Sequence, residues 1–190
     1  TYKYLNGGPG APAFITVRPD IVDRIAPALS GWLGHDAPFA FEPSYRAGPG
    51  IERMRVGTPP VLQMAALDAA LDAWDGVEMA ELRAASITLS RRFIAEVEAR
   101  CPALTLASPR DPAMRGSQVS FHFEQGYAAM QALIDRGVIG DFRAPDIMRF
   151  GITPLYLDTG DIIAAVDVLE AVLRDRLWDA PEYLRKKAVT

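Results

Sequence analysis

Apolar residues recur at helical spacing in three stretches of the chain, and this pattern predicts three long helices. They cover residues 61–74, 77–100 and 161–178. Within each stretch the apolar positions step by three and four residues, which places them on one helix face. Those positions are Val61, Met64, Leu67, Leu71 and Trp74, then Leu82, Leu89, Phe93 and Val97, then Ile162, Val166, Leu169, Leu173 and Leu177. We interpret Trp74 as a core residue.

Short apolar runs between these helices predict strands. In residues 118–123 the apolar positions alternate, so Val119, Phe121 and Phe123 share one face and His122 points the other way. The other predicted strands are residues 13–17, 104–107, 138–142 and 147–152. Shorter helices are predicted behind Asp20, weakened by Pro27, and over residues 127–136, closed by Gly137.

The order of these elements divides the chain into three parts. Residues 101–190 alternate between strand and helix, which predicts a small α+β domain with helices on one face of a sheet. Residues 61–100 form connecting helices, and residues 1–60 are irregular and rich in glycine, proline and aromatic residues. Such long loops are usually functional or wrap around a partner. The charged tail, residues 182–190, is expected to fray.

Composition excludes several classes of partner. The chain has 190 residues, of which 49% are hydrophobic and 23% charged, as in a globular domain. Its net charge of −4 with dispersed basic residues argues against nucleic acid and anionic membranes, and no apolar run reaches the roughly 20 residues of a membrane span. The single cysteine, Cys101, allows no internal disulfide and has no metal-binding cluster around it, which favours the cytoplasm.

The candidate chemistry begins at the first residues. Lys3 lies between Tyr2 and Tyr4 and is followed by Asn-Gly-Gly-Pro-Gly, which predicts a tight turn that presents the lysine amine. Residue types alone favour a surface lysine in a flexible tail. The chain begins with Thr rather than Met, and this motif is crowded against the terminus, so we expect the C-terminal part of a longer protein.

The segment Tyr-Lys-Tyr-Leu-Asn-Gly-Gly-Pro-Gly resembles the cofactor-lysine segment of the kynureninase family, pyridoxal-phosphate enzymes of fold type I that are similar to class V aminotransferases. The resemblance implies an α/β fold in which residues 1–60 end the large cofactor-binding domain and carry dimer-contacting loops. Residues 101–190 would then be the small C-terminal domain. It also implies that Lys3 carries pyridoxal 5'-phosphate and that Tyr2 binds the cofactor phosphate and assists proton transfer.

Two further segments resemble the family's dimer contacts. Gly-Trp-Leu-Gly-His contains Trp32 and His35, and Arg-Val-Gly-Thr-Pro-Pro contains Thr58. The resemblance implies that Trp32 and Thr58 bind the cofactor phosphate of a neighbouring subunit, and His35 could shape the substrate pocket. The alternatives are core packing for Trp32, a helix cap for Thr58 and a loop histidine satisfied by its neighbours.

Arg149 lies in Ile-Met-Arg-Phe-Gly-Ile-Thr-Pro-Leu-Tyr, between Met148 and Phe150. An arginine in apolar surroundings requires an anion. The segment resembles the family's Arg-containing strand, which implies that Arg149 binds the α-carboxylate of the substrate. An exposed arginine on an edge strand is the alternative.

Together these segments predict a kynureninase, which would hydrolyse L-kynurenine, and possibly 3-hydroxykynurenine, to anthranilate or 3-hydroxyanthranilate and L-alanine in tryptophan catabolism and the supply of NAD precursors. Its expected partners are a second copy in a homodimer and the N-terminal half of the enzyme, where the groups that hold the pyridinium ring lie in the family. No metal is expected. The alternatives are a class V aminotransferase or cysteine desulfurase relative, or an inactive fragment that serves dimerisation.

Overall fold

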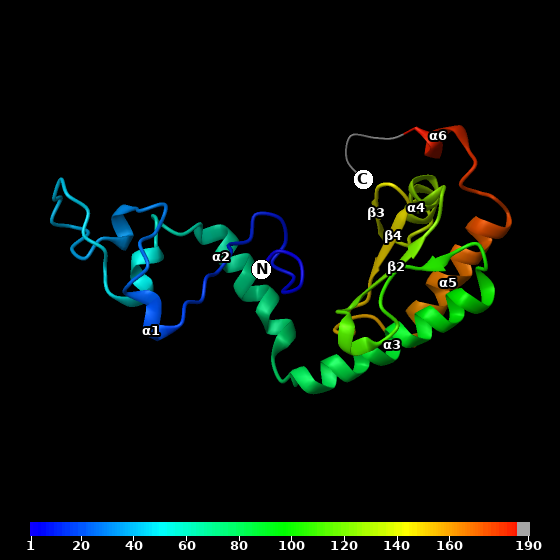
Figure 1. Ribbon diagram of the computed structural model, residues 1–190, viewed down its shortest axis with the longest axis horizontal. Coiled ribbons are helices and arrows are strands. Elements are labelled where there is room, and N and C mark those ends of the chain that lie inside the picture. Colours follow the sequence, from blue (N-terminus) through cyan, green and yellow to red (C-terminus); the bar gives the residue numbers. More distant parts are fainter. Residues whose placement is uncertain (186–190) are drawn as a thin grey trace. The chain divides into compact units, whose positions relative to one another are not determined.

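The computed structural model describes residues 1–185 and divides into two compact units, Thr1–Gly76 and the part of the chain that begins at Val77. Figure 1 follows the elements along the chain. Both helices and strands are present, in agreement with the predicted α/β class. The division differs from the expected boundaries after residues 60 and 100, because the first connecting helix belongs to the first unit and the second helix to the second unit.

A four-stranded antiparallel sheet forms the centre of the second unit. Its strands lie in the order β1-β2-β4-β3, with β1 at Thr105–Leu106, β2 at Gln118–His122, β3 at Asp141–Arg143 and β4 at Ile147–Gly151. In the register of β2 and β4, Val119 pairs with Phe150 and Phe121 with Met148. These four side chains are buried, so the alternation predicted for residues 118–123 is confirmed, and His122 on the opposite face is exposed.

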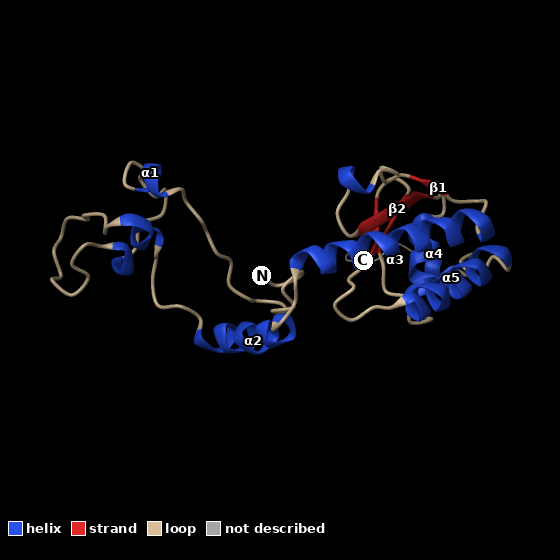
Figure 2. Ribbon diagram, turned by 90° about the horizontal axis from the view of Figure 1, so that it is seen from below, coloured by secondary structure: helices blue, strands red, loops and turns tan. Residues whose placement is uncertain are grey.

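Three helices supply the rest of this core: α3 at Met79–Arg100, α4 at Gly126–Ile134 and α5 at Thr159–Arg174. The predicted apolar face of α3 is confirmed, because Leu82, Leu89, Phe93 and Val97 are all buried. Figure 2 shows α3 and α5 side by side on the same side of the sheet. Asp158 and Asp161 form a capping box that begins α5, which explains why this helix starts three residues before Ile162, its first periodic apolar position.

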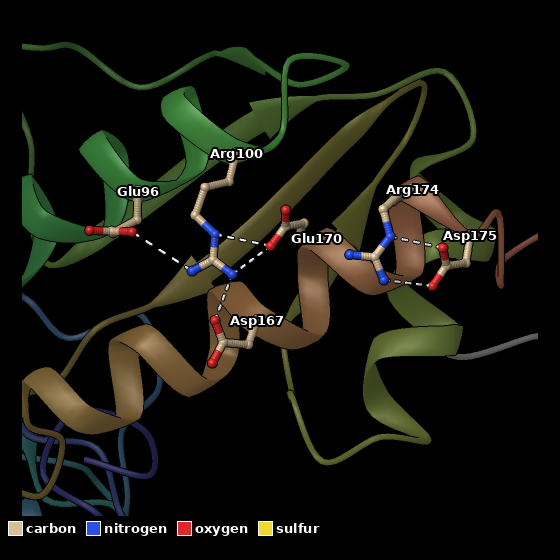
Figure 3. A network of polar contacts seen from close by, with 6 residues as sticks. All are labelled: Glu96, Arg100, Asp167, Glu170, Arg174 and Asp175. Atoms are coloured by element: carbon tan, nitrogen blue, oxygen red, sulfur yellow. Dashed lines mark hydrogen bonds and ion pairs between the residues drawn. The ribbon is translucent and has the colours of Figure 1, made fainter.

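Arg100 links α3 to α5 through carboxylates on both helices (Figure 3). Its Nη2 contacts Asp167 Oδ1 at 2.6 Å and Glu170 Oε2 at 2.5 Å, and its Nη1 lies 3.7 Å from Glu96 Oε2. The hydrogen bonds to Glu170 and Asp167 raise the pKa of the Arg100 guanidinium above its ordinary value. The next residue, Cys101, is buried and forms no disulfide, as predicted.

The first unit contains α1 at Pro19–Val22 and α2 at Val61–Leu71, with short 3-10 turns at Trp32–Gly34, Gly50–Met54 and Asp72–Trp74. Arg53 holds its loops together. The guanidinium is buried and donates to the carbonyls of Gly48 and Asp23 and to the Asp23 carboxylate, the last at 2.7 Å. Backbone and ion-pair bonds therefore order this unit, because Val22 is the one large apolar side chain buried within its described residues.

Several predictions for the first unit were wrong. Residues 13–17 form no strand, because no strand within residues 1–185 pairs with them, and Phe14 and Ile15 are exposed. The helix behind Asp20 ends at Val22, well before Pro27. Helix α2 is present, but none of its residues is buried, and Trp74 is half-buried against Tyr4, with ring centroids 5.7 Å apart, rather than in a core.

The predicted tail also differs in part. Residues Pro181–Leu184 form a short helix, α6, where fraying was expected to begin. The remainder of the predicted tail, residues 186–190, lies outside the described residues.

Candidate functional site

Lys3 lies on an exposed, hydrogen-bonded turn. Gly7 N donates to Thr1 O at 3.2 Å and Gly8 N to Tyr2 O at 3.1 Å, so the backbone folds around the lysine. Gly8 has a φ of 75°, a region that favours glycine. Within the described residues, Lys3 Nζ forms no ion pair and lies 5.3 Å from the centroid of the Tyr2 ring. The structure therefore agrees with the predicted turn that presents an accessible amine.

The turn packs against α2. A Cβ on Gly7 would lie 3.2 Å from Leu67 Cδ1 and 2.8 Å from Ala11 Cβ, so only glycine fits this approach without a shift. The ring contact between Tyr4 and Trp74 fixes the other side of the turn. Lys3 therefore lies on a turn that α2 and Trp74 hold in place.

Trp32 and His35 line one shallow cavity of about 450 Å³ in the loop region. The His35 ring is fully engaged: Nδ1 accepts from Ala37 N at 2.8 Å, and Nε2 lies 3.1 Å from Ser44 O, to which it donates as the neutral tautomer. The Trp32 ring is 48% exposed and packs edge-on against Phe39. The histidine braces the loop, whereas the indole is accessible.

Thr58 lies beside this tryptophan. A Cβ on Gly57 would lie 3.7 Å from Trp32 Nε1, and one on Gly31 would lie 1.7 Å from Val56 O, so the two backbones are in direct contact there. The alternative of a helix cap for Thr58 was wrong, because α2 begins after Pro60 without a side-chain cap. Among residues 1–185, neither the Thr58 hydroxyl nor Trp32 Nε1 has a hydrogen-bond partner. Both groups are therefore free to donate a hydrogen bond to an anion.

Arg149 lies in the second unit, on the sheet face opposite the core. Its neighbours Met148 and Phe150 point into the core, while Arg149 keeps 26% of its side chain exposed. The guanidinium forms an ion pair with Asp141 on β3. Its Nε is buried and has no hydrogen-bond partner within the described part of the chain. A buried N–H without an acceptor is costly, so this atom is suited to an incoming anion.

The second unit has a hollow with a mainly apolar lining. It measures about 640 Å³, and its lining includes Phe93 of α3, Ile152 directly after β4 and Ile162 of α5. Arg149 is not one of its lining residues. Burial raises the pKa of the core thiol of Cys101 to about 11, so it is protonated and unreactive at neutral pH.

The structure brings together Trp32 and His35 in one cavity and places Gly57, the residue before Thr58, near the Trp32 indole. Tyr2 and Lys3 lie together on a separate turn. Within residues 1–185, no hydrogen bond, ion pair or ring contact joins the two groups. The described residues also contain no cluster of metal-binding side chains and no helix long and apolar enough to cross a membrane. Sequence reasoning missed Arg53 and Asp141, the partners that order the loops and Arg149. An acidic residue eight positions before Arg149 was the available signal for Asp141.

The fold defines the class of protein. Solved structures of similar fold include a cysteine desulfurase from Thermococcus onnurineus, with a TM-score of 0.71 and 16% identity over 88% of this chain and 45% of that one. A cystine C-S lyase matches with a TM-score of 0.68 and 22% identity over 81% of this chain and 40% of that one. A variant of this lyase has been solved with glycine linked to its pyridoxal-phosphate cofactor. The chain therefore has the fold of part of a type I pyridoxal-phosphate enzyme.

Sequence comparison identifies the family within this class. Residues 82–169 match the kynureninase C-terminal domain. Kynureninases from Pseudomonas fluorescens and Burkholderia mallei are 48% and 47% identical to this chain over its whole length. The chain spans 46% of the length of these curated relatives. Over its whole length the chain is similar to part of a kynureninase.

Proposed function

We propose that the protein containing this chain is a pyridoxal-phosphate-dependent kynureninase, which adds water to L-kynurenine and releases anthranilate and L-alanine. Conversion of 3-hydroxykynurenine to 3-hydroxyanthranilate would be the same reaction. One observation carries the proposal: identity to kynureninases is 48% across the whole chain, whereas it is 16–22% for the cysteine desulfurase and the lyase of similar fold. We place the reaction in cytoplasmic tryptophan catabolism, which supplies NAD precursors.

Lys3 would hold the cofactor and move the proton. Its amine is accessible on a braced turn, which supports attachment of an aldehyde-bearing cofactor. When bound, pyridoxal phosphate accepts the electron pair released at the substrate carbon atoms. Lys3 Nζ would remove the proton from the substrate Cα, and the Tyr2 hydroxyl would bind the phosphate and assist this transfer.

Trp32 and Thr58 would serve the cofactor of a second copy, so the active enzyme would be a homodimer. The free indole N–H and hydroxyl support a phosphate contact, and their separation from Lys3 within this chain supports a role across a dimer. His35 would shape the substrate pocket by fixing the loop on which Trp32 lies.

Arg149 would bind the α-carboxylate of kynurenine. The unpartnered Nε, next to an Nη that Asp141 already holds, supports this role, because an arginine fork binds a carboxylate through two parallel N–H groups. The groups that hold the pyridinium ring would come from the N-terminal half of the enzyme.

The test uses the full-length enzyme with pyridoxal phosphate. We expect a visible absorbance band that borohydride reduction fixes onto Lys3 in peptide maps, and release of fluorescent anthranilate from L-kynurenine. The matched variant Lys3→Arg, which keeps the charge, should lose both the reducible band and turnover. A band fixed elsewhere would refute the role of Lys3, and release of alanine from cysteine without kynurenine cleavage would indicate a desulfurase instead.

A further inference from the structure

Asp141 lies directly opposite Arg149 in the sheet. The two residues are Cα partners in the pairing of β3 with β4, and their side chains form an ion pair on the face away from the core. Asp141 also accepts a hydrogen bond from Arg143 Nη1 at 2.7 Å. One carboxylate is therefore shared between two guanidinium groups, on a strand whose register fixes their spacing.

The charges of this trio do not cancel. Two guanidinium groups and one carboxylate leave one positive charge. Ser120, the Cα partner of Arg149 on the other side, is neutral, and its hydroxyl accepts from Gln118 Nε2 at 3.2 Å. No second carboxylate pairs with Arg149 among residues 1–185.

Arg149 is the less hydrated of the two guanidinium groups. The Arg143 side chain is 53% exposed, so water solvates its charge, whereas that of Arg149 is 26% exposed and has a buried, unpartnered Nε. Charges that are less hydrated interact more strongly with a counter-ion. An incoming carboxylate would thus gain most by binding Arg149.

We propose that Asp141 is a positioning residue for the amino-acid carboxylate, with Arg143 as its counter-charge. By holding Nη2 of Arg149, Asp141 orders the long side chain before substrate arrives and leaves the adjacent Nε for the carboxylate, which reduces the entropy lost on binding. Arg143 shares the Asp141 charge and so keeps it from neutralising Arg149. The inference rests on the proposed function, in which Arg149 binds the substrate carboxylate.

The experiment compares variants of the full-length, cofactor-loaded enzyme. For Asp141→Asn we expect KM for L-kynurenine to rise about tenfold, the equivalent of one lost charged hydrogen bond, with kcat changed by less than about threefold. The inhibition constant of L-alanine, which offers a carboxylate but no aromatic ring, should rise by a similar factor. Asp175→Asn removes an exposed carboxylate paired with Arg174 and should change neither constant.

Two further variants separate positioning from folding. Asp141→Glu should recover part of the lost affinity, because it restores a carboxylate to the two guanidinium groups. Arg143→Gln should raise KM about threefold, since Asp141 then neutralises Arg149 more fully. Both variants keep a carboxylate at position 141, so they provide the test if Asp141→Asn does not fold.

An unchanged or lower KM in Asp141→Asn would overturn the proposal, because Asp141 would then be neutral toward the substrate or compete with it. An equal effect of Asp175→Asn would overturn it as well. Binding of L-alanine is followed separately by the cofactor absorbance. If the wild type failed to cleave kynurenine yet bound L-alanine in an Asp141-dependent way, the proposed substrate would be wrong while the role of Asp141 stood.

Discussion

The two units of the chain are stabilised in different ways. From Val77 onward, side chains from three helices and a sheet share one core, in which Val97, Phe121 and Val166 are completely buried. In the first unit α2 buries no residue, and Phe14, Phe41 and Leu62 are exposed. Burial of a large apolar side chain contributes about 1.5–3 kcal/mol, so the two units have very different reserves of stability.

The two units carry different parts of the candidate site. Lys3 and Trp32, assigned to the cofactor, lie on the unit without a core of its own, whereas Arg149, assigned to the substrate, lies on the self-contained unit. The cofactor residues would therefore depend on surfaces supplied by the rest of the enzyme and a second copy. The carboxylate site would be ordered by its own sheet.

The most direct test of this difference in stability is to express the two units separately. We expect residues 77–190 to fold alone, with dispersed amide resonances and one cooperative thermal transition. Residues 1–76 should not, since α2 has 11 residues and isolated helices below about 12–15 residues are marginal in water. A cooperative transition from residues 1–76 alone would show that loop hydrogen bonds suffice.

Matched side-chain truncations measure the same difference in stability at single residues. Phe121→Ala removes a fully buried ring and should lower the free energy of unfolding by about 3–5 kcal/mol in urea titrations of this chain. Leu62→Ala, at a side chain that is 82% exposed, should change it by less than about 0.5 kcal/mol. Equal losses would contradict the difference in burial. A larger loss for Leu62→Ala in the full-length enzyme would reveal that α2 is covered there.

The same difference decides what could be predicted from the sequence. In the second unit, periodicity identified α3, the alternation of β2 and the outward direction of His122. The patterns were informative because the apolar residues of both elements are buried in one local core. In the first unit, residues 13–17 have the composition of a strand but no partner strand within the described residues, and the apolar stripe of α2 meets no core. Apolar pattern predicts burial only where the covering surface is present.

The candidate site divides in a similar way. The turn that presents Lys3 followed from its glycines, and resemblance pointed to Trp32 and Thr58, whose segments are in contact at Gly31 and Gly57. Asp141 was missed, because its position opposite Arg149 depends on the register of β3 against β4, which no local pattern fixes.

A smaller effect is expected at the link between α3 and α5. Arg100→Gln leaves Glu96, Asp167 and Glu170 without their shared cation, so we expect a lower free energy of unfolding, with a loss that shrinks in high salt. Arg174→Gln is the control, because its single ion pair with Asp175 is exposed and should contribute less than the Arg100 network. Equal effects would mean that the network of Figure 3 adds nothing beyond surface pairing.

The smallest effect concerns Cys101 and appears only at alkaline pH. Burial raises the pKa of its thiol from 9.0 to about 11, so the folded state holds the proton that the unfolded state releases above pH 9. This contribution to stability is complete below pH 9 and is lost between pH 9 and 11, by about 1 kcal/mol at pH 10. Unfolding titrations of the wild type and Cys101→Ala should therefore converge as the pH rises from 8 to 10. Parallel curves, or rapid alkylation of the folded protein at pH 8, would mean that the second unit opens at Cys101 and that its core is less secure than its burial indicates.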